Sequence, residues 1–135
     1  VEDEIYRESL QHLLEFCRGL GLKIPWGSSG ASIRISTPDS TKPLSIGWLF
    51  PPGVSGWMGL RDVTLGVDTS SAAKQPSAQH SVENYLSSLE NLEGVESVSV
   101  QGLRAFHLNS DALISLSGEI ADIISELVSS INADS

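Results

Sequence analysis

The chain has 135 residues, which suits a single domain with a core of its own. It is acidic, with a formal net charge of −9, and its eight lysine and arginine residues are scattered. Nucleic acids and anionic membranes are bound chiefly through clustered cations, so both classes of partner are disfavoured. Apolar stretches stay far below the ~18 residues of a membrane span, and no secretory leader is recognisable, so we expect a soluble, cytoplasmic protein. Its start without methionine is consistent with a domain excised from a longer protein.

The first segment, roughly residues 2–19, is predicted to be a helix. Apolar side chains from Ile5 to Leu20 recur at steps of three and four residues, and Gly19 and Gly21 can end the helix. Cys17 lies on this apolar stripe as the single cysteine, so we interpret it as a small buried side chain.

Three strands are predicted next, over residues 31–37, 44–50 and 62–68. Apolar and polar residues alternate in each, which predicts a meander with one buried face and one wetter face. The predicted inward side of the second strand consists of Leu44, Ile46, Trp48 and Phe50.

Residues 69–80 have the composition of a linker and are predicted to form a flexible surface loop. A second helix is expected to begin at a cap on Ser81 and to end at Gly94. Residues 95–100 and 103–108 then predict a hairpin around Gln101 and Gly102.

The register of this hairpin has two solutions. A two-residue loop would place Val98, Val100, Leu103 and Ala105 on one face, with Phe106 and Leu108 on the other. A bulged loop would bring Phe106 and Leu108 to the core side instead.

The last segment is predicted to be a helix that is capped by residues 109–111 and has a broad apolar face over residues 113–131. Gly118 predicts a kink or a restart near Ser117. The element order is therefore α-β-β-β-α-β-β-α, which predicts one α+β domain over residues 1–135, with an antiparallel sheet packed against helices. This order is similar to that of the small acidic secretion chaperones, and the resemblance implies protein binding without assigning any residue.

Three functional hypotheses follow. The first is a non-enzymatic protein-interaction domain, with a chaperone-like homodimer as one form, in which the broad apolar face of the last helix buries against a protein partner or a second copy. Its predicted interaction face consists of Leu116, Ile120, Ile124 and Leu127.

The second hypothesis is a module that binds a small molecule or peptide in a tryptophan-lined groove. Its candidate residues stand in glycine-rich or proline-rich segments around the meander, where tryptophans can also simply cover the ends of a sheet. They are Trp26, Trp57, Met58 and Arg61.

The third hypothesis is an enzyme of unrecognised type that uses Asp62, Asp68 or His107. No metal-ligand spacing and no nucleophile motif accompanies these residues, so the sequence predicts neither a metal nor a cofactor.

Overall fold

The computed structural model describes residues 2–25, 30–37, 40–50, 62–98 and 100–133. These residues form five α-helices, a short 3-10 helix and five strands. In chain order the elements are α1 (Glu2–Gly19), β1 (Ala31–Thr37), β2 (Ser40–Leu49), β3 (Val63–Asp68), α2 (Thr69–Ala73), η2 (Pro76–Ala78), α3 (Gln79–Glu90), β4 (Glu96–Ser97), β5 (Leu103–Leu108), α4 (Ser110–Ser115) and α5 (Ser117–Ala133). None of the helices in these ranges combines the length and the apolar character that crossing a bilayer requires.

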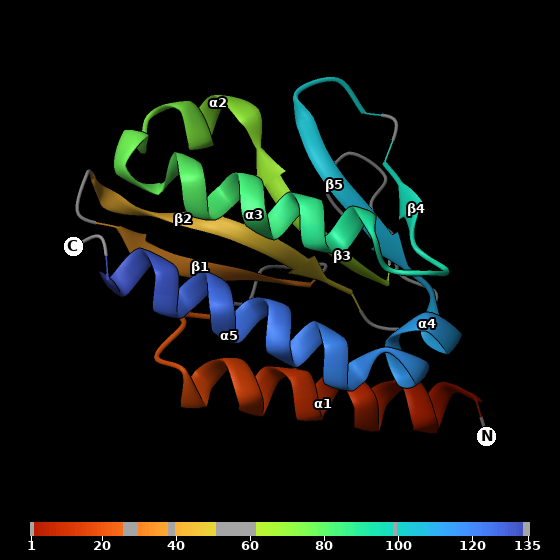
Figure 1. Cartoon of the computed structure of the whole chain (residues 1–135). Helices are drawn as coiled ribbons and strands as arrows, with labels where there is room; N and C mark the ends of the chain where they lie inside the picture. The colour runs from red at the N-terminus through yellow and green to blue at the C-terminus, as the bar shows by residue number, and fades with distance from the viewer. Residues whose placement is uncertain (1, 26–29, 38–39, 51–61, 99, 134–135) are drawn as a thin grey trace.

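The strands form one antiparallel sheet in the order β1-β2-β3-β5-β4. Helix α5 lies beside α1 and α3, and the three helices pack against one face of the sheet (Figure 1). The predicted α+β class and the predicted element order are therefore confirmed.

A β-bulge in β2 changes which side chains face the helices. Ile33 pairs with Gly47 and Arg34 pairs with Ser45, so Ile46 is an extra residue without a partner in β1. An extra residue reverses the alternation of the strand beyond it. The prediction that Trp48 faces the same side as Leu44 and Ile46 was therefore wrong, because Leu49 takes the place on the helix side.

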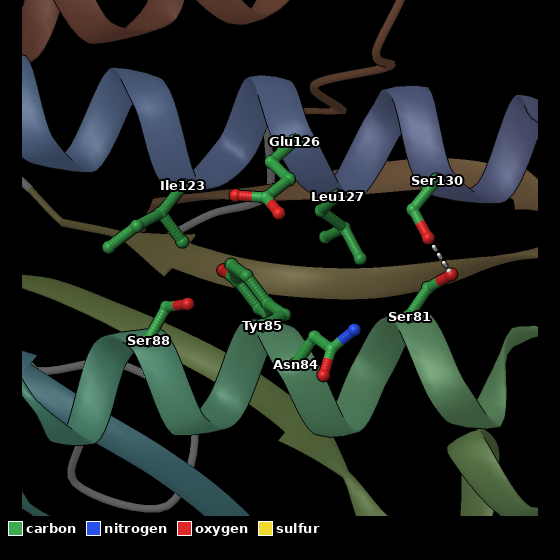
Figure 2. Close-up of a pocket in the computed structure, with 8 residues that line it drawn as sticks. All are labelled: Ser81, Asn84, Tyr85, Ser88, Ile123, Glu126, Leu127 and Ser130. Carbon is green, nitrogen blue, oxygen red and sulfur yellow. Dashed lines mark hydrogen bonds between the residues drawn. The ribbon is translucent and has the colours of Figure 1, made fainter.

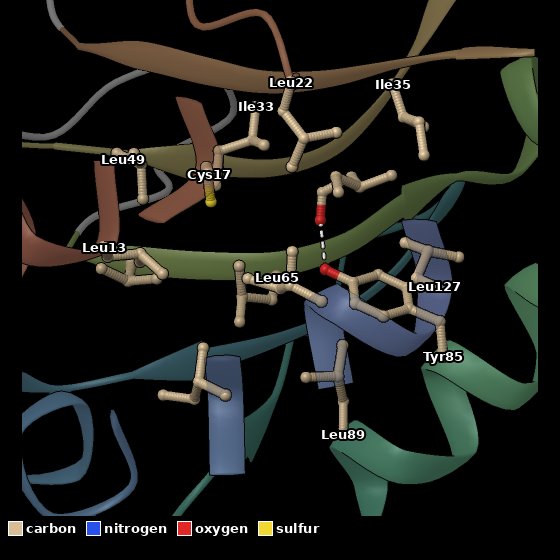
Figure 3. Close-up of a cluster of buried hydrophobic side chains, with 14 of the residues drawn as sticks. Leu13, Cys17, Leu22, Ile33, Ile35, Leu49, Leu65, Tyr85, Leu89 and Leu127 are labelled. Carbon is tan, nitrogen blue, oxygen red and sulfur yellow. Dashed lines mark hydrogen bonds between the residues drawn. The ribbon is translucent and has the colours of Figure 1, made fainter. Parts of the chain in front are cut away.

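The main core lies between this sheet face and the helices. Figure 3 shows side chains of α1, α3, α5 and strands β1 to β3 meeting there, including the buried Cys17. Burial raises the pKa of the Cys17 thiol to about 12, so the thiol remains protonated at neutral pH, as expected of a small core residue. The hydroxyl of Tyr85 donates a 2.6 Å hydrogen bond to the carbonyl oxygen of Ile46, the bulged residue.

A second, smaller cluster lies on the opposite face of the sheet. It consists of Trp48, Phe50, Leu103 and Ala105, with Val98 and Val100 packed against them. Leu108 belongs to the main core, and the partly buried Phe106 packs against it. Of the two registers left open by the sequence, the structure therefore has the side-chain arrangement of the two-residue loop, and Leu103 N–H donates to Val100 O across it at 3.1 Å. Because both faces of β3 are covered, Val63 to Val67 are all buried, in contrast to the predicted wetter face.

The segment 69–80 is helical, where the sequence predicted a loop. It contains α2, η2 and the first two residues of α3, which begins at Gln79 and so two residues before the predicted cap. Ala72, Gln75 and Ala78 are buried, and the Thr37 hydroxyl at the end of β1 donates to the Gln75 side chain. Small and polar residues misled the prediction because they also suit short helical turns that pack closely on a strand end.

The last helix is divided at Leu116, as the sequence predicted near Ser117. Asn109 caps α4 by accepting from Ala112 N–H at 2.8 Å, and Leu116 has non-helical angles before α5 begins at Ser117. Gly118 is thus in the first turn of α5.

A matched pair of glycine substitutions tests this packing. Gly118 is exposed, and an added Cβ would meet nothing within 4 Å, so Gly118→Ala is expected to raise the free energy of unfolding by up to ~1 kcal/mol. Gly66 has φ +153°, and a Cβ there would lie 2.4 Å from the Ala105 Cα, so Gly66→Ala is expected to lower it by at least ~2 kcal/mol. Urea unfolding measures both changes, and equal effects of the two substitutions would contradict the described β3–β5 contact.

Candidate interaction site

The four residues predicted to line a ligand groove lie outside the described residues. Trp26, Trp57, Met58 and Arg61 all fall in segments whose placement is not described. The tryptophan-lined groove therefore stays a prediction.

The predicted interaction face on the last helix is largely inside the molecule. Ile120, Ile124 and Leu127 are buried in the main core, and Leu116 is half-buried against it. Helix α5 lies between α1 and α3 and packs against the sheet, so its broad apolar face is covered within the chain itself (Figure 1). An apolar docking surface in the described chain must therefore take its exposed apolar side chains from other positions.

Three large apolar side chains are instead exposed among the described residues. Ile5 and Phe16 of α1 have relative exposures of 47% and 37%, and Ile114 of α4 has 40%. Ile5 was predicted to belong to the core stripe of this helix, but its neighbour Tyr6 is the buried residue and donates a hydrogen bond to Phe50 O at 2.8 Å. All three exposed side chains lie on α1, which contacts α5, or on α4, which precedes α5 in the chain.

Helices α1, α4 and α5 enclose a groove with a volume of about 260 Å³. Its residues come from one stripe of α1 and from the junction of α4 with α5. They are Ser9, His12, Leu13 and Phe16 on one side, and Leu113, Ser117, Ile120 and Ala121 on the other.

The exposed Ile5 continues the α1 side of this groove. Ile5 precedes Ser9 by four residues, so the two lie on one side of α1 together with His12 and Phe16. Ile114 is adjacent in sequence to the lining residue Leu113. The groove and its exposed apolar border form what we call the α1–α4 groove, defined by the eight lining residues with Ile5 and Ile114.

The sequence of α1 contains a pattern that indicates this groove. Ile5, Ser9, His12 and Phe16 are spaced by four, three and four residues, a helical stripe beside the core stripe of Leu10, Leu13, Leu14 and Cys17. The sequence prediction did not separate the two stripes, because it placed the apolar Ile5 in the core stripe.

A second hollow lies between α3 and α5 but is much smaller. Figure 2 shows Tyr85, Asn84 and Glu126 pointing into the space between the two helices. Ser81 and Ser130 form a hydrogen bond of 2.5 Å at one end. Its volume is about 30 Å³, which leaves room for about one water molecule and none for a larger ligand.

Two of the three residues of the enzyme hypothesis lie together. Asp62 Oδ2 is 3.3 Å from His107 Nε2, and the two side chains are 27% and 16% exposed. Asp62 has φ 54°, in the left-handed region that non-glycine residues rarely adopt. Its charge adds to burial, the larger cause, in raising the pKa of Tyr6.

Asp68 is separated from this pair because it stands at the other end of β3. Its carboxylate caps α2 by accepting hydrogen bonds from Ser70 N–H at 2.9 Å and from the Ser70 hydroxyl at 2.8 Å. Asp68 therefore does not contribute to the Asp62–His107 pair. Neither Asp62 nor His107 lines the groove beside α1 or the small hollow between α3 and α5. Within the described ranges, no three histidine, cysteine, aspartate or glutamate residues gather as metal ligands.

Comparisons with known proteins give no relative for this chain: no family model, no curated protein and no solved structure matches it.

The cap on α2 predicts a specific pH dependence. The hydrogen bonds from Ser70 hold the pKa of Asp68 below its ordinary value of about 3.9, so the cap stabilises the fold at neutral pH and is lost as the pH falls through the folded-state pKa. Asp68→Ala is expected to lower the free energy of unfolding by ~1 kcal/mol at pH 7, and the difference from the native chain should shrink in acid. Asp68→Asn, which can still cap, should lose much less in urea unfolding at pH 7. An Asp68→Ala effect that is constant with pH would contradict the capping role.

Two isoleucine-to-serine substitutions test where the chain presents apolar surface. Ile114→Ser is expected to lower the binding of the neutral dye Nile red, with a stability change within about 0.5 kcal/mol, because Ile114 is exposed. Ile123→Ser, between α3 and α5, should cost ~1 kcal/mol or more and leave dye binding unchanged while the chain is folded. Equal dye binding by the native chain and the Ile114→Ser chain would contradict the accessible groove.

Proposed function

We propose that this chain is a protein-interaction domain that docks a partner protein in the α1–α4 groove. One observation carries the proposal: the exposed Phe16 lines this groove, and the exposed Ile5 continues the same stripe of α1. The third large exposed apolar side chain of the described residues, Ile114, follows the lining residue Leu113 in α4. Apolar side chains gathered on one surface are typical of docking sites, whereas single scattered ones are ordinary.

The shape of the groove supports a protein segment over a small molecule. Its volume of about 260 Å³ is below the roughly 300–1,000 Å³ of typical small-molecule pockets. It is lined by residues of three helices, α1, α4 and α5, an arrangement that receives a row of side chains from a partner. The net charge of −9 further favours a protein over a nucleic acid.

A partner of a different kind is favoured over a second copy of the chain. Two chains of charge −9 would repel each other on approach. The chaperone-like homodimer expected from the element order is therefore the less favoured form of this proposal.

Site-specific photocrosslinking in cells of the source organism tests the proposal. The photoreactive residue p-benzoylphenylalanine at position 16 is expected to crosslink a discrete protein, and at position 87, on the exposed side of α3, to give no such product. Ile114→Ser in the same chain should reduce the product at position 16. The mass of the adduct separates a different protein from a second copy.

The same yield at positions 16 and 87 would show unspecific contact and contradict the proposal. The absence of any protein adduct at position 16 would do so as well.

A further inference from the structure

We infer that the α1–α4 groove receives a positively charged amphipathic helix of the partner protein. The inference rests on the proposed function and adds the chemistry of the partner segment. Two properties of the groove lead to it, namely the spacing of its apolar side chains and the charge along its borders.

The spacing suits a helix that lies along the groove. Ile5 and Phe16 are eleven residues apart on one side of α1, which corresponds to about 16 Å, or three helical turns. A partner helix of similar length would present apolar residues at every third or fourth position to this row and to Ile114. The buried Leu13 and Ile120 form an apolar floor between the two sides.

Acidic residues follow the groove on the α1 side. Glu8 lies three residues after Ile5 and Glu15 lies three residues after His12, so each is a surface neighbour of the apolar row. Both are exposed. The arginines of this helix, Arg7 and Arg18, are close to half a helical turn away from the row and so leave its border acidic.

The opposite side of the groove carries the same sign of charge. Asp111 precedes Ile114 by three residues in α4, so the two are surface neighbours on that helix. Asp111 is exposed. His12 is the one titratable side chain among the eight lining residues.

An apolar floor between two acidic borders is complementary to a helix with one apolar face and lysine or arginine at its edges. Each exposed ion pair adds little affinity, since such pairs are worth roughly 0–1 kcal/mol. Together they attract a cationic segment, orient it and repel an acidic one. The same borders would face like charge in a dimer formed through two copies of this groove.

Titration of the full chain with model helices tests the inference. The probe is a fluorescein-labelled 18-residue amphipathic peptide of leucine and lysine, and the comparison is the same peptide with glutamate in place of lysine. Fluorescence anisotropy is expected to show binding of the lysine peptide, weakened by added salt, and binding of the glutamate peptide at least roughly tenfold weaker.

Two double variants separate the groove from the overall charge. Glu8→Lys with Glu15→Lys is expected to weaken binding of the lysine peptide by roughly tenfold or more. Glu90→Lys with Glu93→Lys changes the net charge by the same amount at exposed positions outside the groove. This double variant should weaken binding of the lysine peptide by less than about threefold. Equal weakening by both double variants would overturn the inference, because the attraction would then be general. Circular dichroism of each variant establishes that it is folded.

Phe16→Ser distinguishes failure of this inference from failure of the proposed function. If this change weakens both peptides equally while the charge variants have no effect, the groove docks helices without charge preference and only the inference falls. If Phe16→Ser affects neither peptide, the groove is not the docking surface and both proposals fall. A dimer of the native chain in sedimentation velocity that dissociates on Phe16→Ser would overturn the inference in favour of a second copy.

Discussion

The hydrogen bond from Tyr85 to the carbonyl of Ile46 is the interaction on which the arrangement of this molecule depends. Ile46 is the extra residue of the β2 bulge and has no partner in the register with β1 or with β3. A buried carbonyl that leaves the ladder needs another donor, and Tyr85 supplies it from α3 at 2.6 Å. Burial raises the pKa of Tyr85, so its hydroxyl keeps the donated proton. One contact thus satisfies the bulge and fixes α3 against the sheet.

The bulge makes both faces of the sheet apolar. Before it, β2 directs Leu44 and Ile46 toward the helices; after it, Leu49 takes that side and Trp48 joins the second cluster on the far face. On the helix side, α3 occupies one part of the sheet and α1 another, and α5 fills the space between them (Figure 1). The broad apolar face of the last helix is therefore buried in the core of its own chain.

The break at Leu116 connects this packing with the groove. Because α4 ends there and α5 starts at Ser117, Leu113 at the end of one helix and Ile120 at the start of the next reach the same space beside α1. Helix α1 contributes its buried stripe to the core and a second stripe, with Phe16, to the groove. The proposed docking surface thus arises where the core ends, and the acidic residues of both sides give it a preference by charge.

The sequence by itself determined the local features, because these depend on neighbours along the chain. The extents of α1 and β1, the cap at Asn109, the restart near Ser117 and the α+β order all follow from periodicity, capping and glycine placement. The tertiary structure decided what depends on distant partners. The bulge at Ile46, the helical turns at 69–80 held by Gln75 and the covering of Ile120 and Ile124 need contacts that no local pattern encodes. The α1–α4 groove belongs to the second kind, since an amphipathic helix shows which of its sides are apolar but only packing decides which one remains uncovered.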